Sequence, residues 1–204
     1  MDAPIGGADH RPLLPRVVAL LRALDGDVGI ATVAAATLRA LDGSAIPEPQ
    51  RQLLVHADGL TPTLERHLGQ PLGLRMLRVR RQGSVLMREI LLVAAGLDHA
   101  VSFGAIRLHL DGFEDGVRSE ILAGVAPLGT ILRDRRVAHQ RRLSGFFQVA
   151  ARALVPAGIA LRDEATLYGR HSELHTPTGQ EMAEVVEILA PLASAARGES
   201  LSRA

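Results

Sequence analysis

LMREILLVAAG, residues 86–96, is the stretch that decides how this sequence folds. It is an apolar run of strand length with an arginine and a glutamate side by side in its middle. Successive side chains of a β-strand point to opposite faces of the sheet, so Arg88 shares a face with Leu86 and Ile90 while Glu89 points the other way. The stretch therefore predicts a strand that places a guanidinium among large aliphatic side chains.

The neighbouring segments continue this pattern and predict an antiparallel meander. Residues 72–81 alternate apolar side chains with arginines, and a tight turn is expected at Gln82 and Gly83. After the strand that contains Arg88, a turn at residues 96–98 leads into another strand at residues 99–110. Three more strands are predicted at residues 141–154, where a helix is the open alternative, and at residues 165–176 and 181–191, which form the last hairpin.

Helical patterns come mainly before the strands. Residues 12–42 carry helical spacing that is interrupted by DGDVG at residues 25–29, and residues 47–59 predict a short helix. In the next helix Thr61 is the expected N-cap, and Gly69 ends the helix. Two further helices are predicted at residues 114–124 and 127–134. The sequence thus predicts an α+β fold with a mostly antiparallel sheet of about six strands.

The composition excludes several classes of function. The chain has 204 residues, 47% of them hydrophobic, which suits one domain with a core built from aliphatic side chains. It has no Cys, and all 23 basic residues are Arg, which excludes disulfides, thiolate metal sites, a Cys nucleophile and a lysine Schiff base. The eight His are scattered without metal-binding spacing, so we expect no metal.

Charge and hydropathy predict a soluble cytoplasmic protein. The net charge of +1 comes without a dense basic stripe, so we expect no nucleic-acid partner. The apolar stretches are too short and too often interrupted by charges to span a membrane, and the N-terminus lacks the pattern of a signal peptide. We also expect a monomer.

Two charged residues in apolar strands are the candidates for chemistry. A buried Arg88 needs an anionic partner, and the alternatives to a ligand are a salt bridge to a nearby carboxylate or an edge position in water. Glu187 shares a strand face with Val185 and Leu189, so its pKa is expected to rise, which suits general acid–base catalysis. The alternative is a structural ion pair of Glu187 with an arginine such as Arg88. The arginine-rich residues 133–142 are read as a solvated face, with an anion patch as the alternative.

Five motifs in order resemble those of the chorismate pyruvate-lyases. They are LLVHADGLTPTLERHLGQPLGLRML at residues 53–77, MREILL at 87–92, APLGTIL at 126–132, LYGRHSEL at 167–174 and VVEILAP at 185–191. The resemblance covers residues 51–192. It implies a six-stranded antiparallel sheet with helices, a ligand sealed in an internal cavity, and no metal or cofactor.

The resemblance also implies roles for four residues. Arg88 matches the arginine that binds the carboxylate of substrate and product, which makes it both a catalytic and a substrate-binding candidate. Glu187 matches the glutamate that contacts the ring hydroxyl and acts as acid or base. Leu128 matches a residue that offers backbone contacts, and Leu60, beside Thr61, matches another residue that lines the site.

The sequence departs from the family pattern at several places. Ser102 and Phe103 stand where a second arginine is common, Tyr168 stands where Trp is common, and Val186 replaces a Thr. Residues 133–165 are longer than expected and match poorly. Around the matching domain, residues 1–50 are read as a helical extension and residues 193–204 as a flexible tail.

Three hypotheses follow for the function. The first is a lyase that eliminates pyruvate from chorismate to give 4-hydroxybenzoate, for quinone or natural product biosynthesis. The second is a non-catalytic sensor of aromatic acids with the same fold. The third is a lyase that acts on an amino-substituted analogue of chorismate.

Overall fold

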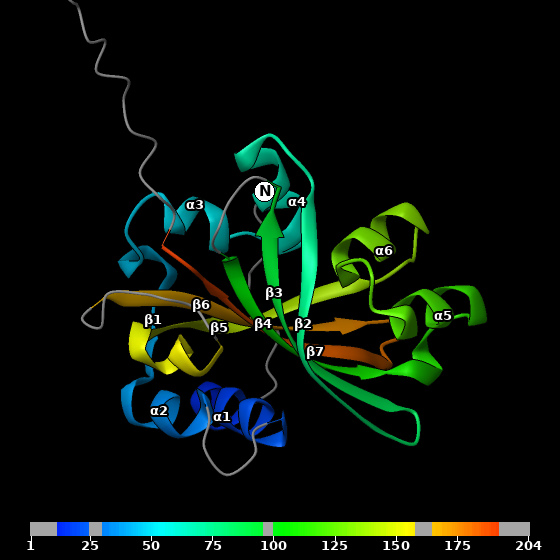
Figure 1. Cartoon of the computed structure of the whole chain (residues 1–204), viewed down its shortest axis with the longest axis horizontal. Helices are drawn as coiled ribbons and strands as arrows, with labels where there is room; N and C mark the ends of the chain where they lie inside the picture. Colours follow the sequence, from blue (N-terminus) through cyan, green and yellow to red (C-terminus); the bar gives the residue numbers. More distant parts are fainter. Residues whose placement is uncertain (1–11, 25–29, 96–99, 158–164, 192–204) are drawn as a thin grey trace, which may run out of the picture.

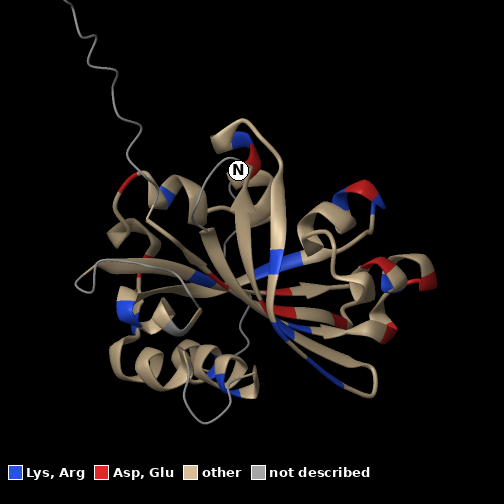
Figure 2. Cartoon of the chain, viewed as in Figure 1, with Lys and Arg blue, Asp and Glu red and all other residues tan. Residues whose placement is uncertain are grey.

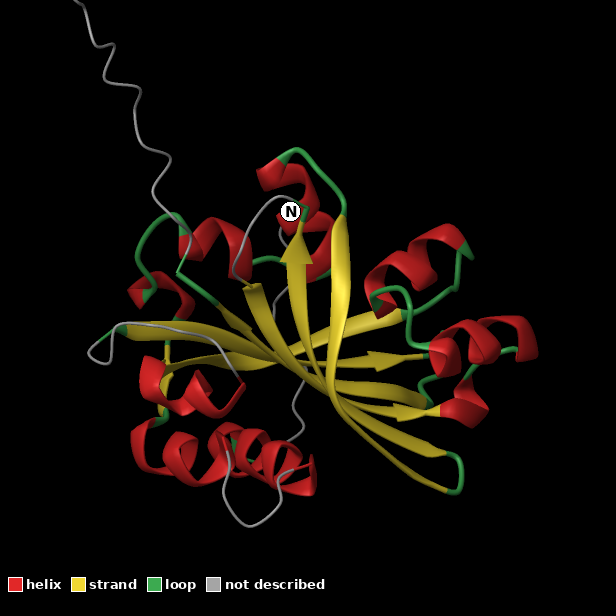
Figure 3. Ribbon diagram, viewed as in Figure 1, coloured by secondary structure: helices red, strands yellow, loops and turns green. Residues whose placement is uncertain are grey.

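Seven strands form one antiparallel sheet in the order β1-β5-β6-β7-β4-β3-β2 (Figure 1, Figure 3). The structure is a computed structural model and describes residues 12–24, 30–95, 100–157 and 165–191. The strands are β1 (Arg39–Leu41), β2 (Leu72–Gln82), β3 (Val85–Ala94), β4 (Ala100–His109), β5 (Gln140–Ala150), β6 (Thr166–His175) and β7 (Glu181–Leu189). The predicted α+β class is therefore confirmed, with β1 as one strand more than expected.

In the described residues, six α-helices and three 3₁₀ turns connect and cover the strands. The helices are α1 (Leu13–Leu24), α2 (Ile30–Thr37), α3 (Gln50–Leu54), α4 (Leu60–Leu68), α5 (Asp115–Ala123) and α6 (Leu128–Asp134). The 3₁₀ turns are η1 (Gly43–Ala45), η2 (Leu110–Gly112) and η3 (Ala151–Ala157). None of the helices within the described ranges has the length and apolarity that crossing a membrane requires.

Most element boundaries agree with the predictions, but the helical pattern predicted to residue 42 ends at Thr37, before β1, and one cap is wrong. The predicted strand at residues 141–154 becomes β5 followed by η3. The N-cap of α4 is Gly59, so the prediction of Thr61 was wrong: Thr61 lies inside the first turn. Gly69 ends the helix with a left-handed φ of 70°, as expected. The predicted turn at residues 96–98 and the tail at residues 193–204 lie outside the described residues.

One face of the sheet is covered by the N-terminal helices. Helices α1 and α2 lie together along this face (Figure 1). Val17, Leu20, Leu21 and Leu24 of α1 are buried against a core that includes Phe103 of β4 and Phe147 of β5. The described helices of the predicted N-terminal extension thus pack directly on the sheet.

The opposite face carries two separate apolar clusters. One cluster joins α3 and α4 to the sheet through residues such as Leu54 and Leu64. The other joins α5 and α6 to the sheet through residues such as Ile121 and Ile131. The figures show the two helix pairs at different ends of the sheet (Figure 1). The sheet surface between them is the floor of the candidate site.

Candidate functional site

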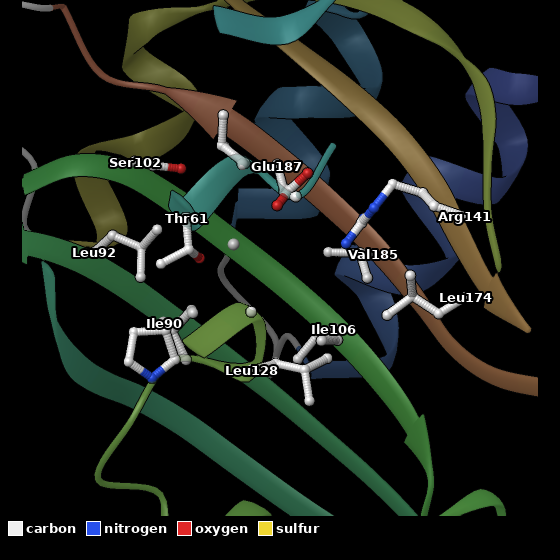
Figure 4. A pocket seen from close by; sticks show the side chains of 15 residues that line it. Thr61, Ile90, Leu92, Ser102, Ile106, Leu128, Arg141, Leu174, Val185 and Glu187 are labelled. Carbon is white, nitrogen blue, oxygen red and sulfur yellow. The ribbon is translucent and has the colours of Figure 1, made fainter. Parts of the chain in front are cut away.

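A hollow lies between these two clusters, where the first turns of α4 and α6 meet above the sheet (Figure 4). The two helix starts approach each other closely, because a Cβ added to Gly129 of α6 would lie 3.2 Å from the Cβ and Oγ1 of Thr61 in α4. About 50 Å³ is open to the centres of water molecules, which is room for a few waters.

The hollow has an apolar floor and a few polar groups. The floor and walls are made by Ile90, Leu92, Ile106, Leu128, Leu174 and Val185, together with Leu60, Pro127 and three glycines. The polar side chains are Thr61, Ser102, Arg141 and Glu187. Such a lining, mostly apolar with a small number of convergent polar groups, is typical of small-molecule sites.

Glu187 is held by an arginine on the neighbouring strand. It lies directly opposite Arg170 in the β6–β7 pair, and Arg170 Nε donates a hydrogen bond to Glu187 Oε2 at 2.7 Å. Arg170 is fully buried, and the Glu187 side chain is 14% exposed. Glu187 therefore forms an ion pair with an arginine, which was the alternative to a catalytic role, but its partner is Arg170 and not Arg88.

The expected rise in the pKa of Glu187 was wrong. Burial alone raises the pKa of this carboxyl, but the nearby guanidinium groups of Arg170 and Arg141 and the hydrogen bond from Arg170 lower it by more, with a smaller contribution from His56. The pKa of Glu187 is therefore lowered. Glu187 is a carboxylate at neutral pH, so it can accept a hydrogen bond from a ligand but has no proton to donate.

Arg141 of β5 is the positive group of the hollow. Its side chain extends over the floor toward Glu187 (Figure 4), and its Nη1 donates to Ser172 Oγ at 2.9 Å. Burial lowers the pKa of Arg141, while the charge of Glu187 opposes this effect. Within the described ranges no carboxylate lies in salt-bridge distance of Arg141, so its charge can be used by a ligand.

Arg88 lies beside the hollow and not in its lining. It faces the same side of the sheet as Ile90, as predicted, and is 1% exposed. Its Nη1 donates to the carbonyl of Ile121 at 3.0 Å, in the last turn of α5, where the helix dipole is negative. Burial lowers the pKa of Arg88 to about 10. Among the residues that the structure describes, no salt bridge explains this arginine, and its burial excludes an exposed edge.

Two nitrogens of Arg88 remain without a hydrogen-bond partner in the described part of the chain. These are Nε and Nη2, and both are buried. Buried donors without acceptors are costly, so the arginine is suited to receive an anion. Its cross-strand neighbour Ile106 lines the hollow, which leaves Arg88 one side chain away from it.

The other two predicted residues, Leu60 and Leu128, line the hollow. Leu60 is the first residue of α4 and Leu128 the first residue of α6, and both line the space. No side chain caps the start of α4, so the backbone N–H groups of Leu60 and Thr61 are not used within the helix. The structure thus brings together Leu60, Leu128 and Glu187, with Arg88 nearby.

A second polar cluster lies on the face covered by α1. Glu184 of β7 is bonded to Arg107 of β4 at 2.6 Å and to His171 of β6 at 2.9 Å. Arg16 of α1 reaches Glu184 at 3.5 Å and also pairs with Glu173. Acidic and basic positions accordingly meet near the middle of the sheet (Figure 2). No three described His, Asp or Glu side chains form a metal-binding group.

The sequence patterns did not indicate two arginines of the candidate site, Arg141 in the lining and Arg170 beside it. Arg141 belongs to the segment that was read as a solvated face, and its position in the hollow comes from the pairing of β5 with β6. Arg170 lies in the motif LYGRHSEL, for which the sequence resemblance gave it no role. Their one available signal was strand alternation, which places Arg170 and Ser172 on the face of Leu174.

Comparisons with known proteins give distant similarities. No protein-family model matches the chain, and no curated protein matches it. Among solved structures, the chain is similar to PhnF from Mycobacterium smegmatis, with 14% identity, 69% of this chain and 70% of that chain covered, and a TM-score of 0.48. The effector domain of that PhnF gives 14% identity, 67% and 90% coverage and a TM-score of 0.49.

A third solved structure is a transcriptional regulator of the GntR family from Enterococcus faecalis V583. It gives 12% identity, coverage of 59% of this chain and 99% of that chain, and a TM-score of 0.40. At such identities and TM-scores these similarities carry no argument about function, which therefore rests on the site itself.

Proposed function

We propose that this protein binds a small organic acid in the hollow between α4 and α6 and does so as a sensor, without converting it. The observation that carries the proposal is the pair of opposite charges, Arg141 and Glu187, that extend over one apolar floor. The ligand is an amphipathic molecule that carries an acidic group and a hydrogen-bond donor on an apolar body. An aromatic hydroxy acid such as 4-hydroxybenzoate has this chemistry.

The acidic group of the ligand is assigned to Arg141. A guanidinium binds a carboxylate through charge-assisted hydrogen bonds, and that of Arg141 has a neutral hydroxyl, Ser172 Oγ, as its hydrogen-bond partner within the described residues. The free N–H groups of Leu60 and Thr61 at the start of α4 add a favourable field for an anion. Arg88 is the alternative receptor through its Nε and Nη2, and a ligand reaches it if the side chain of Ile106 moves aside.

The donor group of the ligand is assigned to Glu187. The hydrogen bond from Arg170 occupies Oε2, and in the described part of the chain Oε1 accepts none. An ionised carboxylate can accept a hydrogen bond from a hydroxyl group, but it would repel a second negatively charged group. The floor between the two charges, formed by residues such as Ile106 and Val185, suits an aliphatic or aromatic ring.

The state of Glu187 favours binding over catalysis. A general acid near neutral pH needs a raised pKa, whereas the pKa of Glu187 is lowered by Arg170 and Arg141. An ion-paired carboxylate that stays charged is a good acceptor and a poor proton donor. This argues for a sensor and against the acid–base role expected from the sequence.

The second candidate is the chorismate pyruvate-lyase reaction. It is favoured by the placement of Leu60, Leu128 and Glu187 around one hollow, as the sequence resemblance implies. Incubation of the purified protein with chorismate, with detection of pyruvate and 4-hydroxybenzoate, decides between the two. Turnover that is lost in Glu187→Gln would overturn the proposal of a non-catalytic sensor.

The binding experiment is calorimetric titration with 4-hydroxybenzoate, benzoate and 4-hydroxybenzamide. We expect 4-hydroxybenzoate to bind best, because benzoate lacks the donor and the amide lacks the charge. Arg141→Met should weaken binding by roughly 10- to 100-fold, which corresponds to about 1.5–3 kcal/mol for a charged hydrogen bond. The control is Arg142→Met, an exposed arginine on the opposite face.

Two outcomes would change the assignment. A large loss in Arg88→Met with none in Arg141→Met moves the acidic group to Arg88, as the sequence resemblance implies. Absence of binding by all three compounds and by their aliphatic analogues overturns the proposed function.

A further inference from the structure

Arg170 makes an unusual set of contacts for a side chain that lies beside the hollow without lining it. Besides Glu187, its guanidinium donates to three backbone carbonyls of the segment at residues 54–58. Nη1 donates to Leu54 O and to His56 O, each at 3.2 Å, and Nη2 donates to Asp58 O at 3.0 Å. One fully buried cation therefore holds a strand carboxylate and a connecting segment at once.

The segment at residues 54–58 leads directly into the site. It joins α3 to α4 and is followed by Gly59, Leu60 and Thr61, which line the hollow. The carbonyls that Arg170 binds lie 112 to 116 residues away in sequence. The position of the first turn of α4 over the sheet is thus fixed by a side chain of β6, in the same row of the sheet as Glu187.

We propose that Arg170 is the positioning residue of this site: it orients the Glu187 carboxylate toward the hollow and ties it to the segment that carries the start of α4. This inference rests on the proposed function and adds a coupling to it. A ligand that forms a hydrogen bond with Oε1 of Glu187 also stabilises the pair that Oε2 makes with Arg170. Through Arg170 it stabilises residues 54–58 and the start of α4. A ligand that does not contact Glu187 has no such effect.

The planar guanidinium is essential to this role. Arg presents donors in a fixed fork, whereas Lys is a point charge on a flexible stem. A lysine at position 170 can still pair with Glu187, but it cannot reach all of the carbonyls of Leu54, His56 and Asp58 together. Arg170→Lys therefore separates the two parts of the proposal, since it keeps the charge and removes the connection.

The same geometry explains how the ligand class is set. Burial favours the neutral form of Glu187, and the charge and hydrogen bond of Arg170 are among the causes that keep its pKa lowered. Without that charge the carboxyl would be protonated more readily and would also accept ligands that offer an acceptor. Arg170 thus determines that the ligand must present a donor at this end of the hollow.

The test compares Arg170→Lys with a matched control. Arg107→Lys makes the same change in the arginine–glutamate pair on the opposite face, where Arg107 lies directly opposite Glu184. We expect Arg170→Lys to speed hydrogen exchange of the amides of residues 54–61 by about tenfold or more, as expected for local opening. It should also weaken, but not abolish, the preference for 4-hydroxybenzoate over benzoate, because the lysine keeps the charge beside Glu187 but no longer fixes the orientation of its carboxylate. Arg107→Lys should leave both unchanged.

A second measurement uses the wild-type protein, in case Arg170→Lys does not fold. Under the proposal, saturating 4-hydroxybenzoate slows exchange of residues 54–61 more than saturating benzoate does, because only the hydroxyl reaches Glu187. Equal slowing by the two acids overturns the coupling. So does an Arg170→Lys protein with wild-type exchange and wild-type preference.

The outcomes separate this inference from the proposed function. If neither acid binds the wild-type protein, the proposed function fails, and exchange in Arg170→Lys still decides whether Arg170 holds residues 54–58. If the acids bind but exchange in that segment does not depend on Arg170, the function stands and the positioning role is overturned.

Discussion

Glu184 and Glu187 of strand β7 lie on opposite faces of the sheet, and each lies directly opposite an arginine of a neighbouring strand. Glu184 faces Arg107 of β4 under helix α1, and Glu187 faces Arg170 of β6 beside the hollow. The two pairs have similar hydrogen-bond distances, 2.6 and 2.7 Å. Their surroundings differ, and this difference separates a structural cluster from a candidate binding site.

Under α1 the carboxylate of Glu184 is fully occupied by side chains of the protein. Glu184 is shared by Arg107, Arg16 and His171, and both of its oxygens are used. Beside the hollow, Arg170 donates from Nε to one oxygen of Glu187 and from Nη1 and Nη2 to backbone carbonyls. The second oxygen of Glu187 and the charge of Arg141 then remain for a ligand. The pair of Glu184 and Arg107 thus belongs to the cluster that holds α1 on the sheet, whereas the pair of Glu187 and Arg170 leaves a carboxylate oxygen at the hollow.

The largest expected effect breaks the pair beside the hollow. Arg170→Met leaves Glu187 poorly solvated without its nearest cation and three carbonyls without their donor, which should cost about 3–5 kcal/mol of unfolding free energy. Arg107→Met should cost only about 1 kcal/mol, because Arg107 is 30% exposed and Glu184 keeps two partners. Urea denaturation measures both. Equal losses would show that the two pairs do not differ as described.

The next largest effect is expected from replacing a glycine by alanine on each face of the sheet, Gly169 on the α1 face and Gly104 at the hollow. A Cβ at Gly169, on the α1 face, would lie 2.5 Å from Phe147 Cζ and 2.6 Å from the backbone oxygen of Glu187. Because backbone cannot move aside cheaply, Gly169→Ala should destabilise by about 1–3 kcal/mol. A Cβ at Gly104 would point into the hollow, 3.2 Å from the flexible Ile90 side chain.

Gly104→Ala should therefore leave stability nearly unchanged while reducing affinity for 4-hydroxybenzoate. Denaturation and calorimetry on the two variants measure stability and binding separately. A Gly104→Ala protein that binds the acid as well as wild type would place the ligand away from this part of the floor.

A third prediction concerns the buried arginine without an anionic partner. Arg88→Met removes two buried donors that lack acceptors in the described residues and keeps an apolar side chain of similar length. Replacing a buried charge by a well-packed apolar group is often stabilising, so we expect a gain of roughly 1–2 kcal/mol. Thermal and urea unfolding check this. A loss of stability would show that the bond to Ile121 outweighs the burial of the charge.

Local patterns predicted the fold well because they depend on near neighbours in sequence. Alternation placed Arg88 with Ile90 and Glu89 on the other face, where Glu89 pairs with Arg78. Strand β1 was missed, since three residues are too short to show a period and its pairing with β5 is long-range. The direction of the pKa change of Glu187 was missed for the same reason, because the register of β6 against β7 brings Arg170 opposite it.

The smallest expected effect is a pH dependence that differs between the faces. Burial, helped by Arg170, lowers the pKa of His56 in the segment beside the hollow, and burial, helped by Arg142, lowers the pKa of His175 on the α1 face. For both rings the unfolded chain takes up a proton that the folded chain resists. Their contributions to stability are therefore complete above the ordinary value of 6.5 and are lost as pH falls below it.

Single variants separate the two rings. His56→Gln and His175→Gln should each flatten the fall in the urea midpoint between pH 8 and pH 5, by an amount limited by one proton, about 1.4 kcal/mol per pKa unit. Only His56→Gln should also flatten the pH dependence of 4-hydroxybenzoate binding. A protonated His56 competes with Arg170, the cation that orients Glu187. If His175→Gln changes binding to the same extent, the two faces communicate, and the α1 cluster is then part of the ligand response and not only a structural clamp.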